Sequence, residues 1–395
     1  MKTLANLNLS NKSVLLRIDI NSPAIKGKIL DNPRFKASAE TIKYLLKKKA
    51  KLTIIAHQGR KGNSDFRPLS QHAKILSRYV KNNINYVNDL FGKEAEKRIN
   101  YLQAGEAILL RNVREYNDET SIKSNNRYKN FCKLFDFYVN DAFSVSHRAQ
   151  GSIILPPRYL SSAIGIEFEK ELKALEKFKN SDSKTKIFVL GGAKTEDYFP
   201  IFKFLKNRKN KLLAAGIMAN LFLIANGHNL GIEENRIKSP NYKSTITKLR
   251  KLYNKYESQI ILPIDFGLFG EKGKRIEASI QQAPFNHKIY DIGKKTAVLF
   301  KENLNKAEYI FMKGPLGFSE IPEFSYATKE ILKHISNLTK NNKIFSVIGG
   351  GHLTATIERY HISNAFSYIS LSGGALIAYI SGERLPGLIA LEKSR

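Results

Sequence analysis

Residues 137–148 read Phe-Tyr-Val-Asn-Asp-Ala-Phe-Ser-Val-Ser-His-Arg, and this stretch decides the fold class. Its aromatic and β-branched start is typical of a buried strand, and Asn140 and Asp141 come where that strand should end. Open α/β sheets bind ligands at the C-terminal ends of their parallel strands. His147 and Arg148 follow closely, so one strand end offers a carboxylate and two cation-capable groups. Taken alone, the cluster is equally well explained as a polar loop after a core strand.

Three earlier segments have the same form. Segments 13–20, 52–56 and 107–110 are aliphatic strand candidates. Polar residues lie at or just after the end of each: Asp19 and Asn21 at the first, His57, Gln58, Gly59 and Arg60 at the second, and Arg111, Asn112 and Arg114 at the third. Arg34 is expected on a loop just before an amphipathic helix over 37–46. Strands separated by helical patterns and ending in charged loops predict a parallel sheet with one binding edge. Repeated Arg and His at that edge favour an anion site.

Glycine turns mark the second half of the chain. The strand candidate 186–190 leads into Gly191, Gly192 and Lys194, the candidate 342–348 leads into Gly349, Gly350, Gly351 and His352, and Gly216 lies in a third turn. Glycines between a strand and a helix let the backbone approach a phosphate, and a helix N-terminus and a lysine add positive potential. The alternative for each turn alone is a tight turn that packs a helix on a sheet.

Taken in order, these motifs resemble the phosphoglycerate kinase family, in its archaeal branch. The strings that carry the resemblance are Asp19-Ile-Asn21, Asn32-Pro-Arg34, His57-Gln-Gly-Arg60, Asn112-Val-Arg114, residues 139–143 with His147-Arg148, Leu190-Gly-Gly-Ala-Lys194, Leu262-Pro-Ile-Asp265, Asp291-Ile-Gly293, Gly314-Pro-Leu-Gly317, Ile348-Gly-Gly-Gly351 and Leu385-Pro-Gly387. They cover nearly the whole chain. Each string is weak evidence by itself, but their common order is very specific.

The resemblance implies an α/β fold with two doubly wound, parallel-sheet (Rossmann-like) domains joined by a hinge helix. The expected bounds are a 3-phosphoglycerate-binding domain over 1–157, the hinge helix over 158–183, a nucleotide-binding domain over 184–369, and a segment over 370–395 that returns to the first domain. The length of 395 residues agrees, because one hydrophobic core rarely supports so long a chain.

The resemblance also implies the reaction and the residue roles. The reaction is reversible phosphoryl transfer between 1,3-bisphosphoglycerate and ADP, with Mg2+ bound as magnesium ATP or ADP. Arg34 and Lys194 would be catalytic. The remaining substrate residues would be Asp19, Asn21, His57, Gln58, Gly59, Arg60, Arg114, His147 and Arg148, and the nucleotide residues Gly191, Gly192, Gly216, Pro315, Glu320, Gly349, Gly350, Gly351 and His352. Neither histidine is expected to act as acid or base, since a carboxylate leaving group needs no general acid.

Several residues depart from the commonest family pattern. His352 stands where an Asp serves the nucleotide-bound magnesium, so the metal ligands are left open. Tyr198 replaces a lysine, and Lys313 replaces an Asn before Gly314. One hypothesis is that Lys313 restores charge lost at Tyr198; the alternative is that Lys313 is one more surface lysine. Arg111 and Ala378 each stand where a Glu is usual.

Composition limits the other classes of function. The chain has no run of about 18 apolar residues and no charged-then-apolar leader, which predicts a protein that neither spans a membrane nor is secreted. A single cysteine, Cys132, suits a reducing compartment, and a cytoplasmic location is expected. The partners expected are the small-molecule substrates, with no nucleic acid and no membrane, and a monomer or homodimer.

The formal net charge of +30 admits one rival reading, a nucleic-acid-binding protein. The lysines are scattered through helical segments without a nucleic-acid module, so we interpret the excess as mostly solvated surface that also attracts anionic substrates. A second rival is a catalytically weakened relative that serves as a scaffold. The paired presence of Arg34 and Lys194 argues against it, because a scaffold has no need of cations aimed at a transition state.

Overall fold

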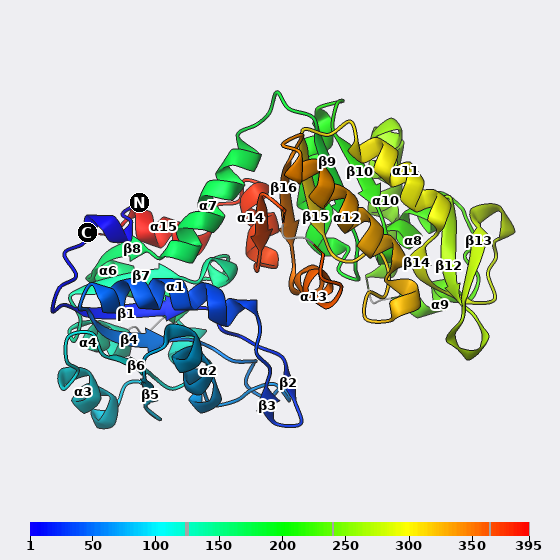
Figure 1. Ribbon diagram of the computed structural model, residues 1–395. Coiled ribbons are helices and arrows are strands. Elements are labelled where there is room, and N and C mark those ends of the chain that lie inside the picture. Colours follow the sequence, from blue (N-terminus) through cyan, green and yellow to red (C-terminus); the bar gives the residue numbers. More distant parts are fainter. Residues whose placement is uncertain (123–125, 239–240, 363–364, 395) are drawn as a thin grey trace. The chain divides into compact units, whose positions relative to one another are not determined.

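The computed structural model describes residues 1–122, 126–238, 241–362 and 365–394. The chain divides into two compact units: residues 1–173 with 382–395, and residues 174–381. Each unit is built on its own six-stranded parallel sheet (Figure 1). The predicted fold class is confirmed. No helix among the described residues is both long and apolar enough to cross a membrane.

The first unit has the strand order β5-β6-β4-β1-β7-β8, and every pairing in it is parallel. The strands are β1 (Ser13–Ile18), β4 (Lys51–Ile55), β5 (Ile84–Tyr86), β6 (Ala107–Leu109), β7 (Phe137–Asp141) and β8 (Ser161–Ile164). The helices are α1 (Pro33–Lys47), α2 (Ser70–Val80), α3 (Lys93–Asn100), α4 (Asn126–Cys132), α5 (Gly151–Ile154), α6 (Pro156–Tyr159), α7 (Ile166–Lys179), which continues into the second unit, and α15 (Pro386–Glu392). The sheet grows outward on both sides of β1, so its topological switch point lies between β1 and β7.

The second unit has the order β11-β10-β9-β15-β16-β17, which is the strand order of the Rossmann fold. Its strands are β9 (Lys186–Leu190), β10 (Lys211–Ala214), β11 (Ile260–Ile261), β15 (Tyr309–Lys313), β16 (Phe345–Gly349) and β17 (Tyr368–Ser370). Its helices are α8 (Gly216–Ala225), α9 (Ile232–Ile237), α10 (Tyr242–Tyr256), α11 (Lys294–Leu304), α12 (Tyr326–Lys340), α13 (Gly351–Arg359) and α14 (Gly374–Ile380), with a 3-10 helix η5 (Glu196–Lys206). The switch point lies between β9 and β15.

A small antiparallel sheet in the second unit did not follow from the sequence. It joins β12 (Asp265–Phe269) to β13 (Arg275–Ser279) and β14 (Lys288–Ile292). Its buried side chains, among them Phe266 and Ile289, form a separate hydrophobic cluster with Leu230 and Phe285. This sheet supplies one wall of the pocket described below.

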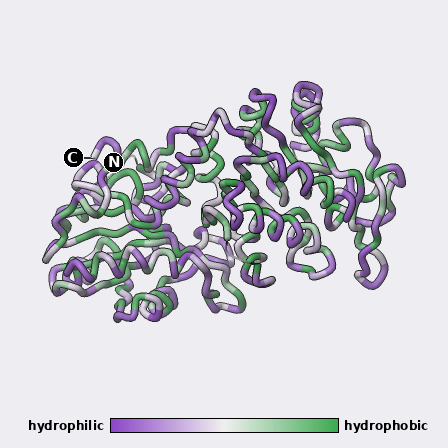
Figure 2. Tube along the Cα trace, turned by 45° about the horizontal axis from the view of Figure 1, so that its top comes forward, coloured by the Kyte–Doolittle hydropathy of each residue, from purple (hydrophilic) through white to green (hydrophobic). Residues whose placement is uncertain are grey.

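Burial explains why the parallel strands read as continuous apolar runs. Val14, Leu16 and Ile18 are fully buried, as are Val189, Ile310 and Val347 in the second sheet. A strand covered by helices on both faces is apolar at nearly every position. Figure 2 shows these strands mainly in green, whereas the helices alternate between green and purple along their length, as amphipathic helices do.

The expected hinge helix over 158–183 is not helical throughout its first part. Ser161–Ile164 form β8, which pairs with β7, and the helix α7 begins only at Ile166. The four strand residues satisfy their backbone hydrogen bonds in the sheet, so pairing with a neighbour decides their conformation rather than local pattern.

Candidate active site

The substrate-side residues converge on Asp19, directly after β1 and therefore at the switch point of the first sheet. Ser144, which follows β7 on the other side of that point, donates its hydroxyl hydrogen bond to the Asp19 carboxylate. Arg34 forms an ion pair with the same carboxylate. Two strands and a helix thus deliver polar groups to one place.

Arg34 lies in the first turn of α1, not on a loop before the helix as expected. The side chain of Asn32 accepts a hydrogen bond from the Arg34 backbone N–H at 2.9 Å, and Pro33 occupies the first helical position. Both residue types start helices, since one caps a free N–H group and the other needs none. The early start places the Arg34 guanidinium beside Asp19, where its side chain remains one-quarter exposed.

Electrostatics fix the charge states of Asp19 and His57. Burial alone would raise the pKa of Asp19, but Arg34, His57 and hydrogen bonds from Ser144 and Asn21 hold that pKa well below its usual range. Burial lowers the pKa of His57 well below its usual range; Asp19, with its Oδ1 at 3.9 Å from His57 Nε2, opposes this shift, and nearby arginines reinforce it. Asp19 is therefore ionised and His57 neutral near pH 7.

Arg60, Arg114 and Arg148 form a group that we call the basic patch. Burial, together with the charges of Arg17 and Arg148, lowers the pKa of Arg114 to about 10. Burial and the charge of Arg60 lower the pKa of Arg148. Burial is the larger cause of both shifts, and the like charge of the neighbouring guanidinium groups adds to it. An anion bound among them would relieve the repulsion of these like charges, and planar guanidinium groups match phosphate oxygens in geometry.

Gly59 and Gln58 shape the basic patch from behind. Gly59 has a φ of +62°, and a Cβ there would lie 2.6 Å from the backbone nitrogen of Phe66, so only glycine fits. Its carbonyl accepts a hydrogen bond from Arg114 at 2.6 Å, and its N–H donates to Asn21 at 2.8 Å. Gln58 is fully buried, and its amide bonds the backbone of Ser22. Gln58 thus supports the loop from inside the unit rather than facing a ligand.

Arg17 is a part of the site that the sequence reading missed. It is fully buried in β1, where its Nε donates to the Ser152 hydroxyl at 2.9 Å and its Nη2 lies 3.1 Å from Nδ1 of His57. The Ser152 hydroxyl in turn donates to the buried carboxylate of Glu119 at 2.8 Å. One signal was present: a charged residue inside the apolar run of β1.

His147 and Asp141, two residues of the opening motif, face different neighbours. The ring of His147 is half-buried and its Nε2 accepts a hydrogen bond from Nε of Arg148 at 3.2 Å. Asp141 instead faces α7, where it accepts the backbone N–H of Phe168 at 3.0 Å. Burial raises the pKa of Asp141 to about 7, against hydrogen bonds from Thr41 and the α7 backbone.

In the second unit, the glycine turns meet at the switch point between β9 and β15. Gly191 donates its N–H to Lys313 O at 2.9 Å, and Gly192 donates to Pro315 O at 2.7 Å. Gly216 has a φ of +56°, and a Cβ there would lie 2.8 Å from the Gly192 backbone. The backbones therefore touch directly, and a side chain at Gly216 would hold them apart.

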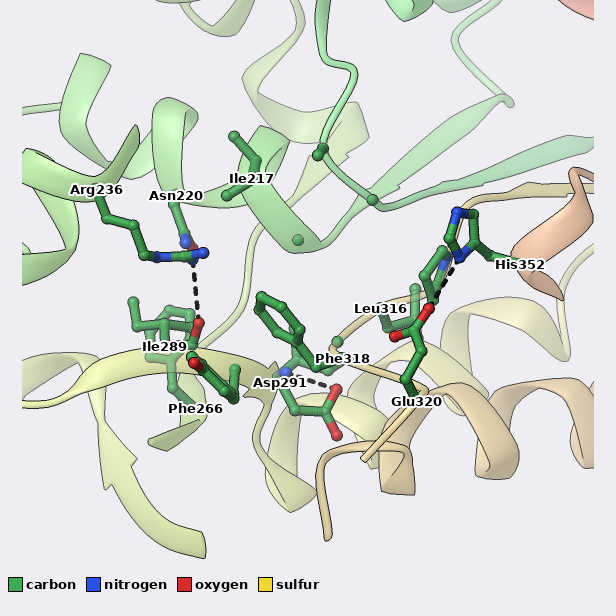
Figure 3. Close-up of a pocket in the computed structure, with 17 residues that line it drawn as sticks. Ile217, Asn220, Arg236, Phe266, Ile289, Asp291, Leu316, Phe318, Glu320 and His352 are labelled. Atoms are coloured by element: carbon green, nitrogen blue, oxygen red, sulfur yellow. Dashed lines mark hydrogen bonds and ion pairs between the residues drawn. The ribbon is translucent and has the colours of Figure 1, made fainter. Parts of the chain in front are cut away.

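A pocket of about 260 Å3 opens beside these turns (Figure 3). Its walls are mostly apolar and come from α8, the antiparallel sheet and the loop after β15, with Ile217, Phe266, Leu316 and Phe318 among the lining residues. Figure 3 shows Glu320 and His352 together at one end and Asn220 and Arg236 at the other. A flat apolar slot with polar groups at its ends suits an aromatic base.

Glu320 and His352 lie within 2.9 Å of each other, and both are largely exposed. His352 is in the first turn of α13, after Gly350, whose φ of +108° needs glycine. Among the described residues, no three His, Cys, Asp or Glu side chains are grouped to hold a metal. A histidine is a poor ligand for Mg2+, which prefers oxygen.

Lys194 and Lys313, at the ends of the loop after β9 and of β15, differ in their exposure. Lys194 is exposed and lines a second cavity of about 340 Å3 with Asp197. Lys313 is buried, so the alternative that it is one more surface lysine was wrong; its Nζ donates to Gly373 O at 2.6 Å. Burial lowers its pKa to about 8, with Asp197 raising and Lys194 lowering it. Tyr198 is buried and donates to Gly191 O at 2.8 Å.

Comparisons with known proteins agree with this geometry. Residues 4–383 match the family model described as Phosphoglycerate kinase. A curated relative from Methanothermus fervidus, named phosphoglycerate kinase, is 38% identical over 100% of this chain and 97% of its own length. The crystal structure of phosphoglycerate kinase from Pyrococcus horikoshii superposes with a TM-score of 0.92 at 35% identity, covering 99% of this chain and 98% of that one. The enzyme from Coxiella burnetii gives a TM-score of 0.81 at 27% identity, covering 100% and 99%.

Proposed function

Because the chain belongs to the phosphoglycerate kinase family, we propose that its Asp19 cluster binds 3-phosphoglycerate and its glycine turns bind the nucleotide. The enzyme catalyses reversible phosphoryl transfer between 1,3-bisphosphoglycerate and ADP, which gives 3-phosphoglycerate and ATP. The observation that supports the substrate assignment is the grouping of Arg34, Arg114 and Arg148 around the buried Asp19 carboxylate.

On the substrate side, the basic patch holds the phosphate that is not transferred. Arg60 is the exposed member of the patch, whereas Arg114 and Arg148 are partly buried. Folding has already removed part of the water around these two guanidinium groups, so the phosphate displaces little more when it binds. Asp19 accepts a hydrogen bond from the substrate hydroxyl, and the Asn21 amide donates one to the carboxylate end of the substrate. His57 is neutral, and we assign it to shaping the site rather than to moving a proton.

On the nucleotide side, the apolar slot holds the base, Glu320 bonds the ribose hydroxyls, and the Gly191 and Gly350 turns approach the phosphates. Mg2+ accompanies the nucleotide, and its ligands are mainly phosphate oxygens, as is usual for this ion. Asp197 is the carboxylate that we place nearest to it, because Asp197 lines the cavity beside Lys194. Magnesium supplies neutralisation of the phosphate charge.

Arg34 and Lys194 carry the chemical step in this proposal. Phosphoryl transfer needs in-line positioning and neutralisation of charge on the moving group more than covalent help. The two substrates are assigned to different units, and reacting atoms must come within about 3.5 Å of each other, so the two units must close during the cycle. Closure excludes water and brings both cations to the phosphoryl group at the same time.

We also predict a cytoplasmic protein, active as a monomer or homodimer, whose ligands are these small molecules and not nucleic acid or membrane. The prediction rests on the family and on the buried single cysteine, whose thiol has its pKa raised by burial to about 12 and is therefore unreactive.

The direct test is a coupled assay for ADP formation from ATP that depends on 3-phosphoglycerate. The matched variant is Arg114→Met, which keeps the length of the side chain while removing its charge. We expect turnover in the wild type and a large loss of 3-phosphoglycerate affinity by calorimetry in the variant. Binding of 3-phosphoglycerate at wild-type affinity in Arg114→Met would refute the basic patch, and salt-sensitive DNA binding that 3-phosphoglycerate does not inhibit would favour the nucleic-acid reading.

A further inference from the structure

The end of the base pocket away from Glu320 carries a polar cluster that the proposed reaction does not use. Asn220 on α8 is 2% exposed, and Glu233 on α9 is fully buried. Nδ2 of Asn220 donates to Oε1 of Glu233 at 3.0 Å. Asn220 also lines the pocket (Figure 3). Burying the Glu233 carboxylate and the Asn220 amide beside an apolar pocket costs free energy. A contact with the pocket's ligand would account for that cost.

Glu233 determines which way the Asn220 amide points. The Glu233 carboxylate accepts from Arg236 Nε at 2.9 Å and from the Ile289 backbone N–H at 3.2 Å, and Arg236 Nη2 forms an ion pair with it. Both of its oxygens thus accept hydrogen bonds from these neighbours, and a carboxylate paired with an arginine acts as an acceptor. Asn220 must therefore turn its NH2 group toward Glu233. The Oδ1 acceptor is then the side of the amide left for the pocket.

Neighbouring groups hold this arrangement still. Arg236 Nη2 also donates to the Ile289 carbonyl at 3.3 Å, so α9 is tied to β14. The Arg236 guanidinium lies 5.6 Å from the centre of the Phe318 ring, which stacks on Tyr290 at 4.2 Å. Phe318 is nonetheless 38% exposed beside the pocket. The exposed part of this aromatic side chain is a surface on which a base can pack.

We propose that Asn220, oriented by Glu233, selects a purine with an amino group at position 6 over one with an oxo group there. The acceptor Oδ1 bonds the 6-amino group of adenine, whereas it faces the oxygen of a 6-oxo base acceptor to acceptor. This inference rests on the proposed function, because it takes the pocket to be the nucleotide site. Asn220 is the specificity-determining residue, and Glu233 is a positioning residue that acts through it.

The experiment compares adenine with hypoxanthine nucleotides, which share the ribose and the phosphates. Calorimetry gives the dissociation constants of ADP and IDP, and the coupled assay gives kcat/KM for ATP and ITP. A single group placed to hydrogen-bond its ligand discriminates by about 10-fold or more. We expect that preference for adenine in the wild type and its near disappearance in Asn220→Ala. Asn226→Ala, which removes the same side chain at the C-cap of α8, is the control and should keep the preference.

Glu233→Gln tests the orienting step without touching the base. A Gln side chain can accept or donate, so it no longer forces the Asn220 amide one way, and the preference should fall while ADP still binds. Equal affinity for ADP and IDP in the wild type, or a preference for IDP, overturns the proposal, as does a preference that survives Asn220→Ala. Failure of the proposed function is seen separately: ADP would then bind with its base preference intact, but no 3-phosphoglycerate-dependent turnover would occur.

Discussion

Asp141→Asn tests whether the buried carboxylate at the end of β7 acts as a pH-sensitive cap of α7. Asp141 is 5% exposed and accepts the Phe168 N–H at 3.0 Å, while Thr41 bonds the neighbouring Ile166 N–H at 2.9 Å. An Asn side chain is nearly the same size and keeps one acceptor oxygen for Phe168. It removes the charge and nothing else that the cap needs.

The magnitude follows from the pKa. Burial raises the pKa of Asp141 from 3.8 to about 7 in the folded protein. Each unit of difference corresponds to about 1.4 kcal/mol, so ionising Asp141 costs the folded state up to about 4 kcal/mol. The folded state binds the extra proton, hence stability is greatest below the unfolded pKa and is lost as pH rises through about 4 to 7. Asp141→Asn should therefore stabilise the protein, with a gain that grows over this range and is constant above it.

The assay is urea unfolding of the wild type and of Asp141→Asn at about pH 5 and about pH 8. Most of the expected pH-dependent loss of wild-type stability falls between these two pH values. Asp89→Asn is the control, because Asp89 accepts the Ala95 N–H in the first turn of α3 from a partly exposed position. It isolates the effect of replacing a capping carboxylate by an amide where the side chain is not fully buried. If Asp141→Asn and the wild type lose stability in parallel between the two pH values, the carboxylate is not the titrating group and the reasoning fails.

Three further predictions concern catalysis. Arg34→Ala should lower the turnover number about 100-fold or more with a smaller effect on substrate binding, and an unchanged turnover number with a raised KM would show that Arg34 only binds. Arg60→Ala should weaken 3-phosphoglycerate binding by calorimetry and leave ADP binding unchanged, whereas normal 3-phosphoglycerate affinity would remove Arg60 from the basic patch. Burial lowers the pKa of Lys313 to about 8. If its charge assists phosphate binding, the KM for ATP should rise between about pH 7 and pH 9 in the wild type but not in Lys313→Met. Identical pH profiles of the two proteins would exclude that role.

Local pattern was enough for the strands that bear the substrate residues. The stretch 137–148 predicted a strand that ends at Asn140 and Asp141, and β7 ends at Asp141. Segment 107–110 became β6, shorter by one residue. Strands buried on both faces leave a continuous apolar signal, and their ends are marked by the first polar residues.

The rest of the site depends on contacts between distant segments, which a local pattern does not contain. Asn220 and Glu233 meet only because α8 and α9 both pack against β14. Arg17 was read as part of a strand, since its partners Ser152 and His57 come from other elements. The sequence left open whether Lys313 was one more surface lysine in a lysine-rich chain. Its burial depends on packing against a distant segment, where its Nζ donates to the Gly373 carbonyl.

Residues 382–395 belong to the first unit although the whole second unit precedes them in the chain. Figure 1 shows α15, in red, against β8 and α6. Gly387 on α15 donates its N–H to the Ser146 carbonyl at 2.9 Å, and a Cβ on Gly387 would lie 2.8 Å from the Ser146 side chain. Ser146 directly precedes His147 and Arg148.

On the ribosome, this order means that the first unit is translated first but receives the supporting helix α15 only after the second unit has emerged. The loop that carries Arg148 therefore lacks its α15 support throughout the synthesis of residues 174–381. A nascent chain can fold the β1–β8 sheet early, yet α15 braces this loop only later, so under the proposed function tight binding of 3-phosphoglycerate follows the synthesis of the second unit.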